Sequence, residues 1–246
     1  MTLSLAACGG NNEESGTSDV TVDGNQLDAE QYYNTYLSSD PTTLDSVKGN
    51  DTYSWSILLN IMEPLTRLDE QDGENVRVAA GAESWESNDD GTVWTFHLND
   101  NKWSDGEPVT AGDYVYGIQR TLNPDSGSVN SYLITCIKNG EAVNNGEMSV
   151  DQLGVRAVDD KTLEITLEQP TPYFLSLTDT RAMLPQRRDI VEQYGDTYGA
   201  EASNIVCNGP FKIESWTHNS EIVVTKNDEY WDADNVYLDK VTWQII

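Results

Sequence analysis

Short stretches in which apolar and polar residues alternate run through much of the sequence. The clearest follows the turn dipeptide Asp90-Gly91, where Trp94, Phe96 and Leu98 fall on one face and the residues between them on the other. A period of two residues behind a favoured turn predicts one strand of a β-hairpin. Similar patterns predict paired strands at 155–158 with 162–167 and at 211–216 with 222–226, and single strands at 31–37 and 238–246.

Helical stretches lie between these strands. Five apolar residues recur at spacings of three and four from Trp55 to Leu65, and Asp51 or Thr52 precedes them in the position of a helix cap. A second helix is expected after Thr110, because Asp113 stands where a capping box has its acid. No repeat with a period of about 20 to 50 residues is present, so the interspersed strands and helices predict an α/β fold.

The charge balance narrows the possible partners. The chain has 14 Lys and Arg residues against 42 Asp and Glu residues, which gives a net charge of −28 with histidine neutral. Phosphate groups would be repelled, so nucleic acid is excluded as a partner. The 7 Trp, 12 Tyr and 3 Phe residues exceed what a disordered acidic chain contains, so the chain is expected to fold.

The residues that could carry catalysis do not form a recognisable active site. Ser104 stands beside Asp105, but a serine nucleophile needs a base, and the two histidines are His97, expected on a regular strand, and His218. Neighbouring acids such as Asp89-Asp90 are typical of solvated turns, and their linear spacing does not place two carboxylates face to face. No catalytic residue, metal site or cofactor is expected, and a secreted acidic hydrolase is kept as the alternative class.

The three cysteines are too few for a disulfide framework. A bridge between Cys136 and Cys207 stays open in an oxidising exterior. Nothing in their spacing requires one, so two free thiols are favoured.

Two neighbouring segments resemble a known family. They read Trp94-Thr95-Phe96-His97-Leu98 and Lys102-Trp103-Ser104-Asp105-Gly106-Glu107-Pro108-Val109-Thr110-Ala111-Gly112-Asp113. They are similar to the hallmark segment of the oligopeptide-binding proteins of ABC importers, family 5 of the bacterial extracellular solute-binding proteins. The likeness covers roughly residues 44–246, because further pieces agree in order and spacing: Thr43-Leu44-Asp45, Ala82-Glu83-Ser84-Trp85, Asp159-Asp160-Lys161-Thr162-Leu163-Glu164, Asn208-Gly209-Pro210-Phe211-Lys212 and Asn227-Asp228-Glu229-Tyr230-Trp231-Asp232.

The resemblance implies the N-terminal half of a two-lobed fold of the type II periplasmic-binding-protein-like class. In this family an extended peptide lies between the lobes, and the chain is expected to stop before the second lobe. The first lobe is expected to have two parts. Residues 27–62 and 187–246 would form an α/β part, and residues 63–186 an inserted strand-rich subdomain.

The N-terminus carries a second resemblance. Leu5-Ala6-Ala7-Cys8-Gly9 resembles the lipobox of bacterial lipoproteins, in which the cysteine thiol carries a diacylglycerol. Residues 1–8 are therefore expected to be the remnant of a lipoprotein signal peptide, with Cys8 as the lipid attachment site. Residues 9–26 are rich in Gly, Asn, Ser and acid, and a flexible tether is expected there.

These resemblances imply an extracellular solute-binding lipoprotein, not an enzyme, on the outer face of the cytoplasmic membrane or in the periplasm. It would capture oligopeptides and deliver them to the permease and ATPase subunits of an ABC importer. Binders of dipeptides, nickel or heme share the fold and stay as alternatives. The complete protein is expected to be a monomer.

The candidate ligand contacts also come from the family resemblance. The stretch where the first lobe's loop enters its helix lies along the bound peptide in family members, and here it consists of Asn50, Asp51, Thr52 and Tyr53. Helix capping by Asp51 is compatible with such contact. Another family contact, often aromatic, falls at Val129, which leaves the size and type of the ligand open.

Overall fold

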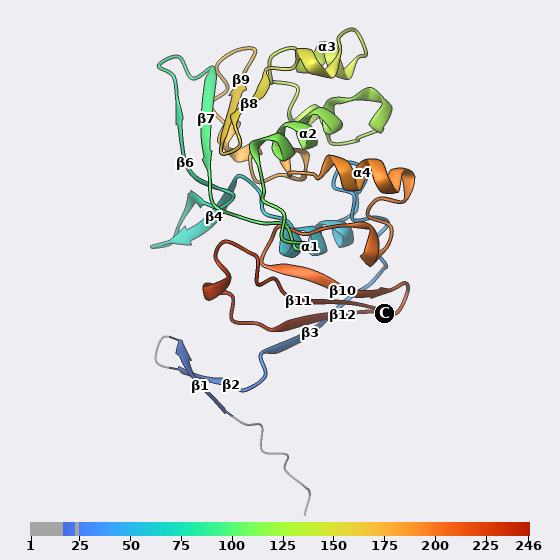
Figure 1. The fold of residues 1–246 in the computed structure, drawn as a ribbon. Coiled ribbons are helices and arrows are strands. Elements are labelled where there is room, and N and C mark those ends of the chain that lie inside the picture. Colours follow the sequence, from blue (N-terminus) through green and yellow to red (C-terminus); the bar gives the residue numbers. More distant parts are fainter. Residues whose placement is uncertain (1–16, 23–24) are drawn as a thin grey trace, which may run out of the picture.

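A computed structural model gives the fold, and it describes residues 17–22 and 25–246. Two four-stranded sheets form its framework (Figure 1). The first sheet has the order β10-β11-β12-β3, with β12 parallel to β3 and the other pairs antiparallel. Its strands are β3 (Tyr32–Leu37), β10 (Phe211–Thr217), β11 (Glu221–Lys226) and β12 (Lys240–Ile245). A strand near the start of the chain is therefore held by the last strand.

The second sheet is antiparallel throughout and has the order β6-β7-β9-β8. Its strands are β6 (Ala82–Ser87), β7 (Val93–Leu98), β8 (Val155–Asp159) and β9 (Thr162–Thr166). The alternation predicted around Asp90-Gly91 is confirmed, because Phe96 of β7 is fully buried and pairs with the fully buried Leu163 of β9. This apolar face forms part of the core.

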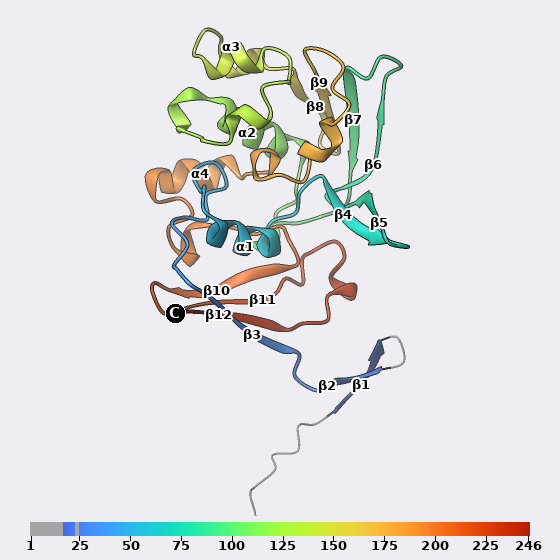
Figure 2. The same cartoon turned by 180° about the vertical axis from the view of Figure 1, so that it is seen from behind.

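Helices cover the inner faces of the sheets. Helix α2 (Ala111–Leu122) packs on β8 and β9, and α3 (Gly140–Asn144) lies next to it, as Figure 2 shows from behind. The capping acid predicted at the start of α2 is confirmed, since the Asp113 carboxylate accepts a 2.9 Å hydrogen bond from the Thr110 backbone N–H. Helix α4 (Arg188–Tyr194) follows in the chain. The 3-10 helices are η1 (Pro124–Ser126), η2 (Ser131–Leu133), η3 (Val150–Gln152), η4 (Phe174–Leu177), η5 (Arg181–Met183), η6 (Gly195–Thr197), η7 (Ala202–Asn204) and η8 (Ala233–Asn235).

Helix α1 (Thr52–Ile61) lies on the first sheet next to β10 (Figure 1). Its predicted cap is confirmed: the Asp51 carboxylate accepts a 2.7 Å hydrogen bond from the Ser54 backbone N–H. Ile57, Leu58 and Ile61 are buried against the core. Leu59 is 53% exposed, so one further apolar side chain of the helix is left uncovered by the described chain.

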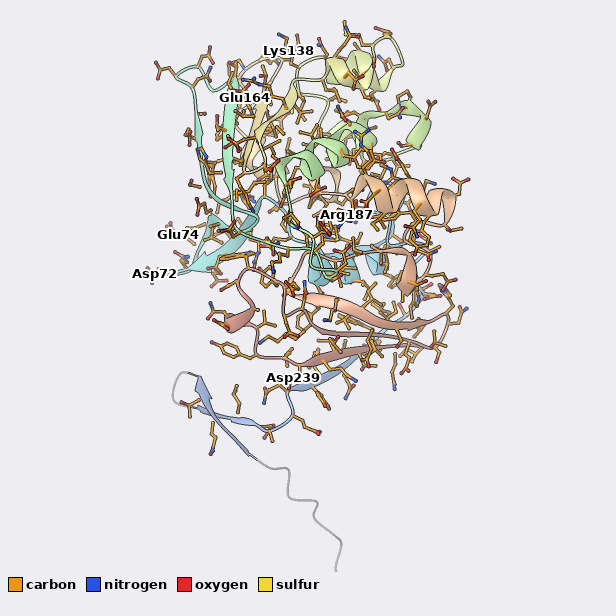
Figure 3. The ribbon with its side chains drawn as sticks, viewed as in Figure 1. Asp72, Glu74, Lys138, Glu164, Arg187 and Asp239 are labelled. Carbon is orange, nitrogen blue, oxygen red and sulfur yellow. The ribbon has the colours of Figure 1, made fainter. Side chains whose placement is uncertain are left out.

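Two hairpins form separate two-stranded sheets beside the two four-stranded ones. Strands β4 (Thr66–Gln71) and β5 (Glu74–Ala79) join through Asp72-Gly73, and the positive φ of both residues, 55° and 81°, fits a type I′ turn. Asp72 and Glu74 mark its projecting tip in Figure 3. The sequence pattern does not predict this hairpin, because most of its side chains are polar on both faces.

The second of these hairpins pairs β1 (Thr17–Val22) with β2 (Asn25–Asp28). It overlaps the stretch 9–26, for which a flexible tether is predicted, and it continues to Asp28. The β-branched residues Thr17, Val20, Thr21 and Val22 favour an extended backbone here. The predicted lipid attachment site, Cys8, lies outside the described residues.

The cysteines of the described chain, Cys136 and Cys207, are free thiols. Burial raises the pKa of Cys207 to about 12, so this thiol is protonated at neutral pH. Within the described part of the chain, no helix has the length and apolar character needed to cross a bilayer.

Candidate functional site

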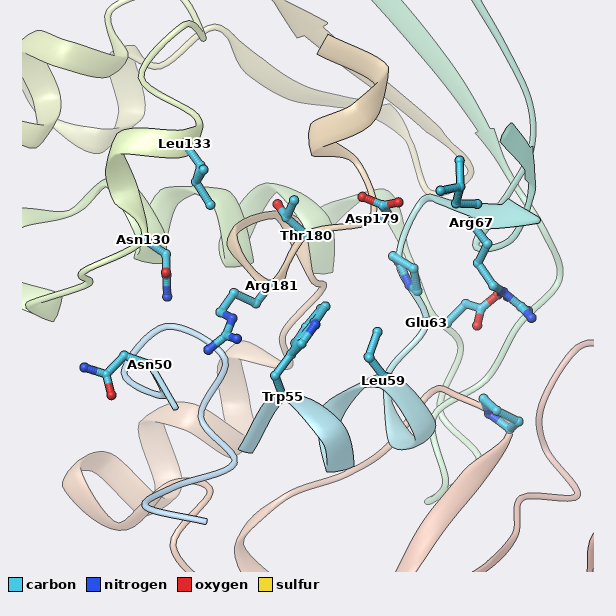
Figure 4. Close-up of a pocket in the computed structure, with 13 residues that line it drawn as sticks. Asn50, Trp55, Leu59, Glu63, Arg67, Asn130, Leu133, Asp179, Thr180 and Arg181 are labelled. Atoms are coloured by element: carbon cyan, nitrogen blue, oxygen red, sulfur yellow. Dashed lines mark hydrogen bonds and ion pairs between the residues drawn. The ribbon is translucent and has the colours of Figure 1, made fainter. Parts of the chain in front are cut away.

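An open cavity of about 640 Å³ lies over α1, on the side away from the first sheet (Figure 4). Elements far apart in the sequence surround it: the loop before α1, the helix itself, the start of β4, η2 and η5. Its apolar lining consists of Trp55, Leu59, Pro64, Leu68, Leu133 and Pro210. Its polar lining consists of Asn50, Glu63, Arg67, Asn130, Asp179, Thr180 and Arg181.

Helix α1 supplies the apolar wall. Trp55 and Leu59 are four residues apart, so both side chains project from the same face of the helix, into the cavity (Figure 4). The opposite face carries the buried Ile57 and Ile61. An exposed leucine beside an indole in a concave surface is typical of a site that a ligand covers.

Arg181 lies at the end of the cavity that is lined by Asn50 and Asn130 (Figure 4). Its Nη1 donates a 2.9 Å hydrogen bond to the Gly49 carbonyl oxygen, and its guanidinium carbon lies 4.9 Å from the centre of the Trp55 ring. Asn130 Nδ2 donates a longer hydrogen bond, 3.4 Å, to the same carbonyl. These contacts join η5 and the loop before η2 to the loop that enters α1.

The other charged groups of the cavity are compensated within the chain. Glu63 Oε1 accepts hydrogen bonds from Arg67 Nη2 at 2.7 Å, from the Tyr230 hydroxyl at 3.1 Å and from Trp231 Nε1 at 3.3 Å. Burial raises the pKa of Glu63, and the charge of Arg67 opposes that rise. Asp179 pairs with Arg77 at 2.7 Å.

The four residues predicted to contact the ligand have different surroundings in the structure. Asn50 lines the cavity. Both oxygens of Asp51 are engaged by Ser54 and Thr42, and these hydrogen bonds outweigh the effect of burial and lower the pKa of the Asp51 carboxyl. Thr52 is exposed. The Tyr53 hydroxyl shares a 2.9 Å hydrogen bond with Ser38 Oγ.

Several cavity residues were not singled out from the sequence. Asn130 and Arg181 lie 80 and 131 positions after Asn50, and only the folded chain brings them together. Val129, the position of the further family contact, is 53% exposed and precedes Asn130. The one local signal for Arg181 is a basic residue in a stretch of polar and acidic ones, Thr178-Asp179-Thr180, and such a residue is usually on a solvated surface.

The side chains considered as candidate catalytic residues contact other parts of the chain. Ser104 Oγ accepts a 3.1 Å hydrogen bond from the Cys207 backbone N–H. His97 lies 3.2 Å from Glu86, and His218 lies 2.7 Å from Asp40. Across the described residues, no group of three or more His, Cys, Asp or Glu side chains could hold a metal ion.

Comparison with known proteins gives a consistent result. The family described as "Bacterial extracellular solute-binding proteins, family 5 Middle" matches residues 78–246. The dipeptide-binding protein DppE of Bacillus subtilis is 38% identical over 99% of this chain, and the oligopeptide-binding protein OppA of the same species is 36% identical over 100% of it. The chain spans 44% of the length of each of these two relatives.

Solved structures agree with this match. The substrate-binding domain of an oligopeptide ABC transporter from Bacillus anthracis superposes with a TM-score of 0.85 and 42% identity, over 89% of this chain and 42% of the other. OppA of Listeria monocytogenes bound to peptide gives a TM-score of 0.84 and 38% identity, over 89% and 43%. The predicted fold class is thereby confirmed: the described residues form part of the two-lobed fold of these binding proteins.

Proposed function

The chain belongs to family 5 of the bacterial extracellular solute-binding proteins, and from this we propose that it forms one side of a peptide-binding site. In the complete protein this site would capture oligopeptides and deliver them to the permease and ATPase subunits of an ABC importer. The role is binding and release without chemical change. The natural protein would act as a monomer outside the cytoplasmic membrane.

The open cavity over α1 is the observation that carries this proposal. It combines an apolar wall, Trp55 and Leu59, with polar groups at Asn50, Asn130 and Thr180. A cavity of about 640 Å³ is large enough for several side chains and their water molecules. Hydrated, roomy pockets of this kind accept varied side chains, while the peptide main chain supplies hydrogen bonds that do not depend on sequence.

A second lobe would close over the cavity in the complete protein. The chain spans less than half of its matched relatives, and the cavity between α1, η2 and η5 is open rather than enclosed. Closure around a peptide would be a hinge motion driven by contacts from both sides. Asn50 to Tyr53, where the loop enters α1, would contact the peptide from this side.

Calorimetry on the full-length natural protein tests the proposal. Peptides of two, four and eight residues should bind with micromolar or lower Kd for at least one length and should raise the melting temperature. The peptides should be recovered intact by mass spectrometry after overnight incubation. Absence of binding at every length, or cleavage of a bound peptide, would contradict the proposal.

The length series also addresses dipeptide binding, the second candidate. That candidate is favoured by the 38% identity to a relative named as a dipeptide-binding protein. A dipeptide receptor should bind the two-residue peptide at least about tenfold more tightly than the longer ones, a difference of about 1.4 kcal/mol in binding free energy. The opposite order would identify an oligopeptide receptor.

We also propose that the natural protein is a lipoprotein anchored through Cys8. The lipobox-like Leu5-Ala6-Ala7-Cys8 supports this proposal. When the protein is expressed with its natural leader in a bacterial host, labelled palmitate should be incorporated into the wild-type protein and lost in Cys8→Ser. Ser4→Ala is the control and should keep the label. Label that persists in Cys8→Ser would contradict anchoring at this residue.

A further inference from the structure

Arg181 differs from the other buried or half-buried arginines because no carboxylate pairs with it. Arg67, Arg77, Arg120 and Arg187 each have a guanidinium nitrogen 2.7 Å from a carboxylate oxygen. Acids outnumber bases 42 to 14 in this chain, so partners are plentiful. Among the described residues, the contacts of Arg181 are the Gly49 carbonyl and the face of Trp55.

Those two contacts fix the guanidinium in the cavity wall without using up its donors. A guanidinium has five N–H groups, and one of them is donated to Gly49. The Trp55 ring supports the planar group from one side. The remaining donors lie at the end of the cavity where the amides of Asn50 and Asn130 also stand (Figure 4).

Two candidate carboxylates, one that acts on Arg181 through its charge and one two positions before it in the sequence, are already engaged. Asp51 accepts hydrogen bonds from Ser54 and Thr42, and Asp179 pairs with Arg77. Burial lowers the pKa of Arg181, and the charge of Asp51 opposes this only in part. Arg181 has therefore lost part of its hydration, and its contacts with Gly49 and Trp55 supply no negative charge in return.

Building on the proposed peptide-binding function, we propose that Arg181, with the amides of Asn50 and Asn130, forms a subsite for a carboxylate of the bound peptide. A planar guanidinium matches a carboxylate with two parallel hydrogen bonds, and two amides can donate to its remaining lone pairs. The carboxylate could come from an acidic side chain or from the free C-terminus. Both sources offer the same group to the site.

The net charge makes this subsite easy to isolate experimentally. At −28 the protein as a whole repels an acidic ligand, and that repulsion is weakened by salt. A preference for an acidic peptide over its neutral isostere would therefore have to come from a local cation. Arg181 is such a cation in this cavity, whereas Arg67 is neutralised by Glu63.

Matched tetrapeptides test the subsite on the full-length natural protein by calorimetry. The reference peptide has neutral side chains and an amidated C-terminus. The reference peptide has Gln at each of its four positions. Four further peptides each have one of these Gln residues replaced by Glu, at a different position in each, and a fifth has the free C-terminal carboxylate. We expect one of these five to bind at least about tenfold more tightly than the reference, and its identity tells a side-chain source from a terminal one.

Variants of the protein then assign the preference to Arg181. The measured quantity is the Kd of the reference peptide divided by the Kd of the preferred carboxylate peptide. In Arg181→Gln this ratio should fall towards one, and Arg181→Lys should keep part of the preference. Arg156→Gln is the matched control: it removes the same charge from an exposed pair on β8 and should leave the ratio unchanged. Melting temperatures of the three variants show whether each is folded.

The outcomes separate the subsite from the proposed function. If the wild-type protein binds the reference peptide but prefers no carboxylate, the subsite is refuted and peptide binding stands. A preference that survives in folded Arg181→Gln refutes the subsite as well. If no peptide binds to the wild-type protein, the proposed function fails and the subsite falls with it.

Discussion

Replacing Asp45 by alanine is expected to lower the free energy of unfolding by about 3–5 kcal/mol, the usual cost of removing one partner from a buried ion pair. Asp45 accepts two hydrogen bonds from Arg120, at 2.9 and 2.7 Å, and a third from the Val47 backbone N–H at 3.1 Å. The side chains of Asp45 and Arg120 are only 1% and 12% exposed. Urea unfolding followed by tryptophan fluorescence measures the change.

The expected loss of stability is large because the mutation leaves the buried Arg120 guanidinium without a carboxylate partner. Without Asp45, the Arg120 guanidinium keeps Gln186 Oε1 and the Tyr198 ring as contacts, but neither carries a charge. Water cannot easily reach it, so the charge stays uncompensated. The double change Asp45→Leu with Arg120→Met should recover part of the loss, because no buried charge then remains.

A second ion pair in the chain serves as the control. Arg156 and Glu164 also make two hydrogen bonds, at 2.7 and 3.0 Å, but Arg156 is 65% exposed, and Glu164 lies on β9 in the upper part of Figure 3. Glu164→Ala should cost no more than about 1 kcal/mol, as exposed pairs do. Equal losses for Asp45→Ala and Glu164→Ala would show that burial does not control the strength of these pairs.

The Asp45 pair also matters to the site, because it fixes the loop that leads to Asn50. The Leu44 backbone N–H donates a 2.7 Å hydrogen bond to the Gly199 carbonyl, and Gly49 donates to the Asp45 carbonyl at the same distance. These contacts hold the loop from both ends. Asp45→Ala would keep these backbone bonds but would remove the bonds of the Asp45 side chain to Val47 and Arg120, so we expect it to weaken ligand binding as well as stability.

Local signals in the sequence predicted much of the fold. The hairpin around Asp90-Gly91, the cap at Asp51 and the acid of the capping box at Asp113 each depend on residues a few positions apart. Such features can be inferred from a single sequence because the physical cause lies within one turn or one strand pair. The β4–β5 hairpin was missed despite Asp72-Gly73, because most of the residues in its strands are polar.

The cavity could not be inferred in the same way. Trp55 and Leu59 read as part of the buried face of an amphipathic helix, yet Leu59 is 53% exposed in the cavity. Arg181 meets the loop at Gly49 across 132 positions, and nothing near Arg181 in the sequence indicates that contact. Family resemblance supplied Asn50, whereas the three-dimensional arrangement was needed for Asn130, Thr180 and Arg181.

Replacing Thr52 by tryptophan is expected to weaken peptide binding by about 10- to 100-fold, because filling occupied space costs about 1–3 kcal/mol. Thr52 is the exposed first residue of α1, two positions after Asn50 of the cavity. An indole at this point would take volume that the bound peptide needs. The free energy of unfolding should change by no more than about 0.5 kcal/mol, since the site is on the surface and the Asp51 cap is kept.

The same substitution at another exposed threonine makes the prediction specific. Neither threonine lines the cavity itself, but Thr217 ends β10 and does not belong to the segment that enters α1 from Asn50, so Thr217→Trp should leave the peptide Kd unchanged. Both variants add the same apolar surface, so non-specific association would affect them equally. If Thr52→Trp binds peptide as tightly as Thr217→Trp with unchanged stability, then the start of α1 serves only as a helix cap. The ligand contacts of this chain would then lie within the cavity, whose lining includes Trp55, Leu59 and Arg181.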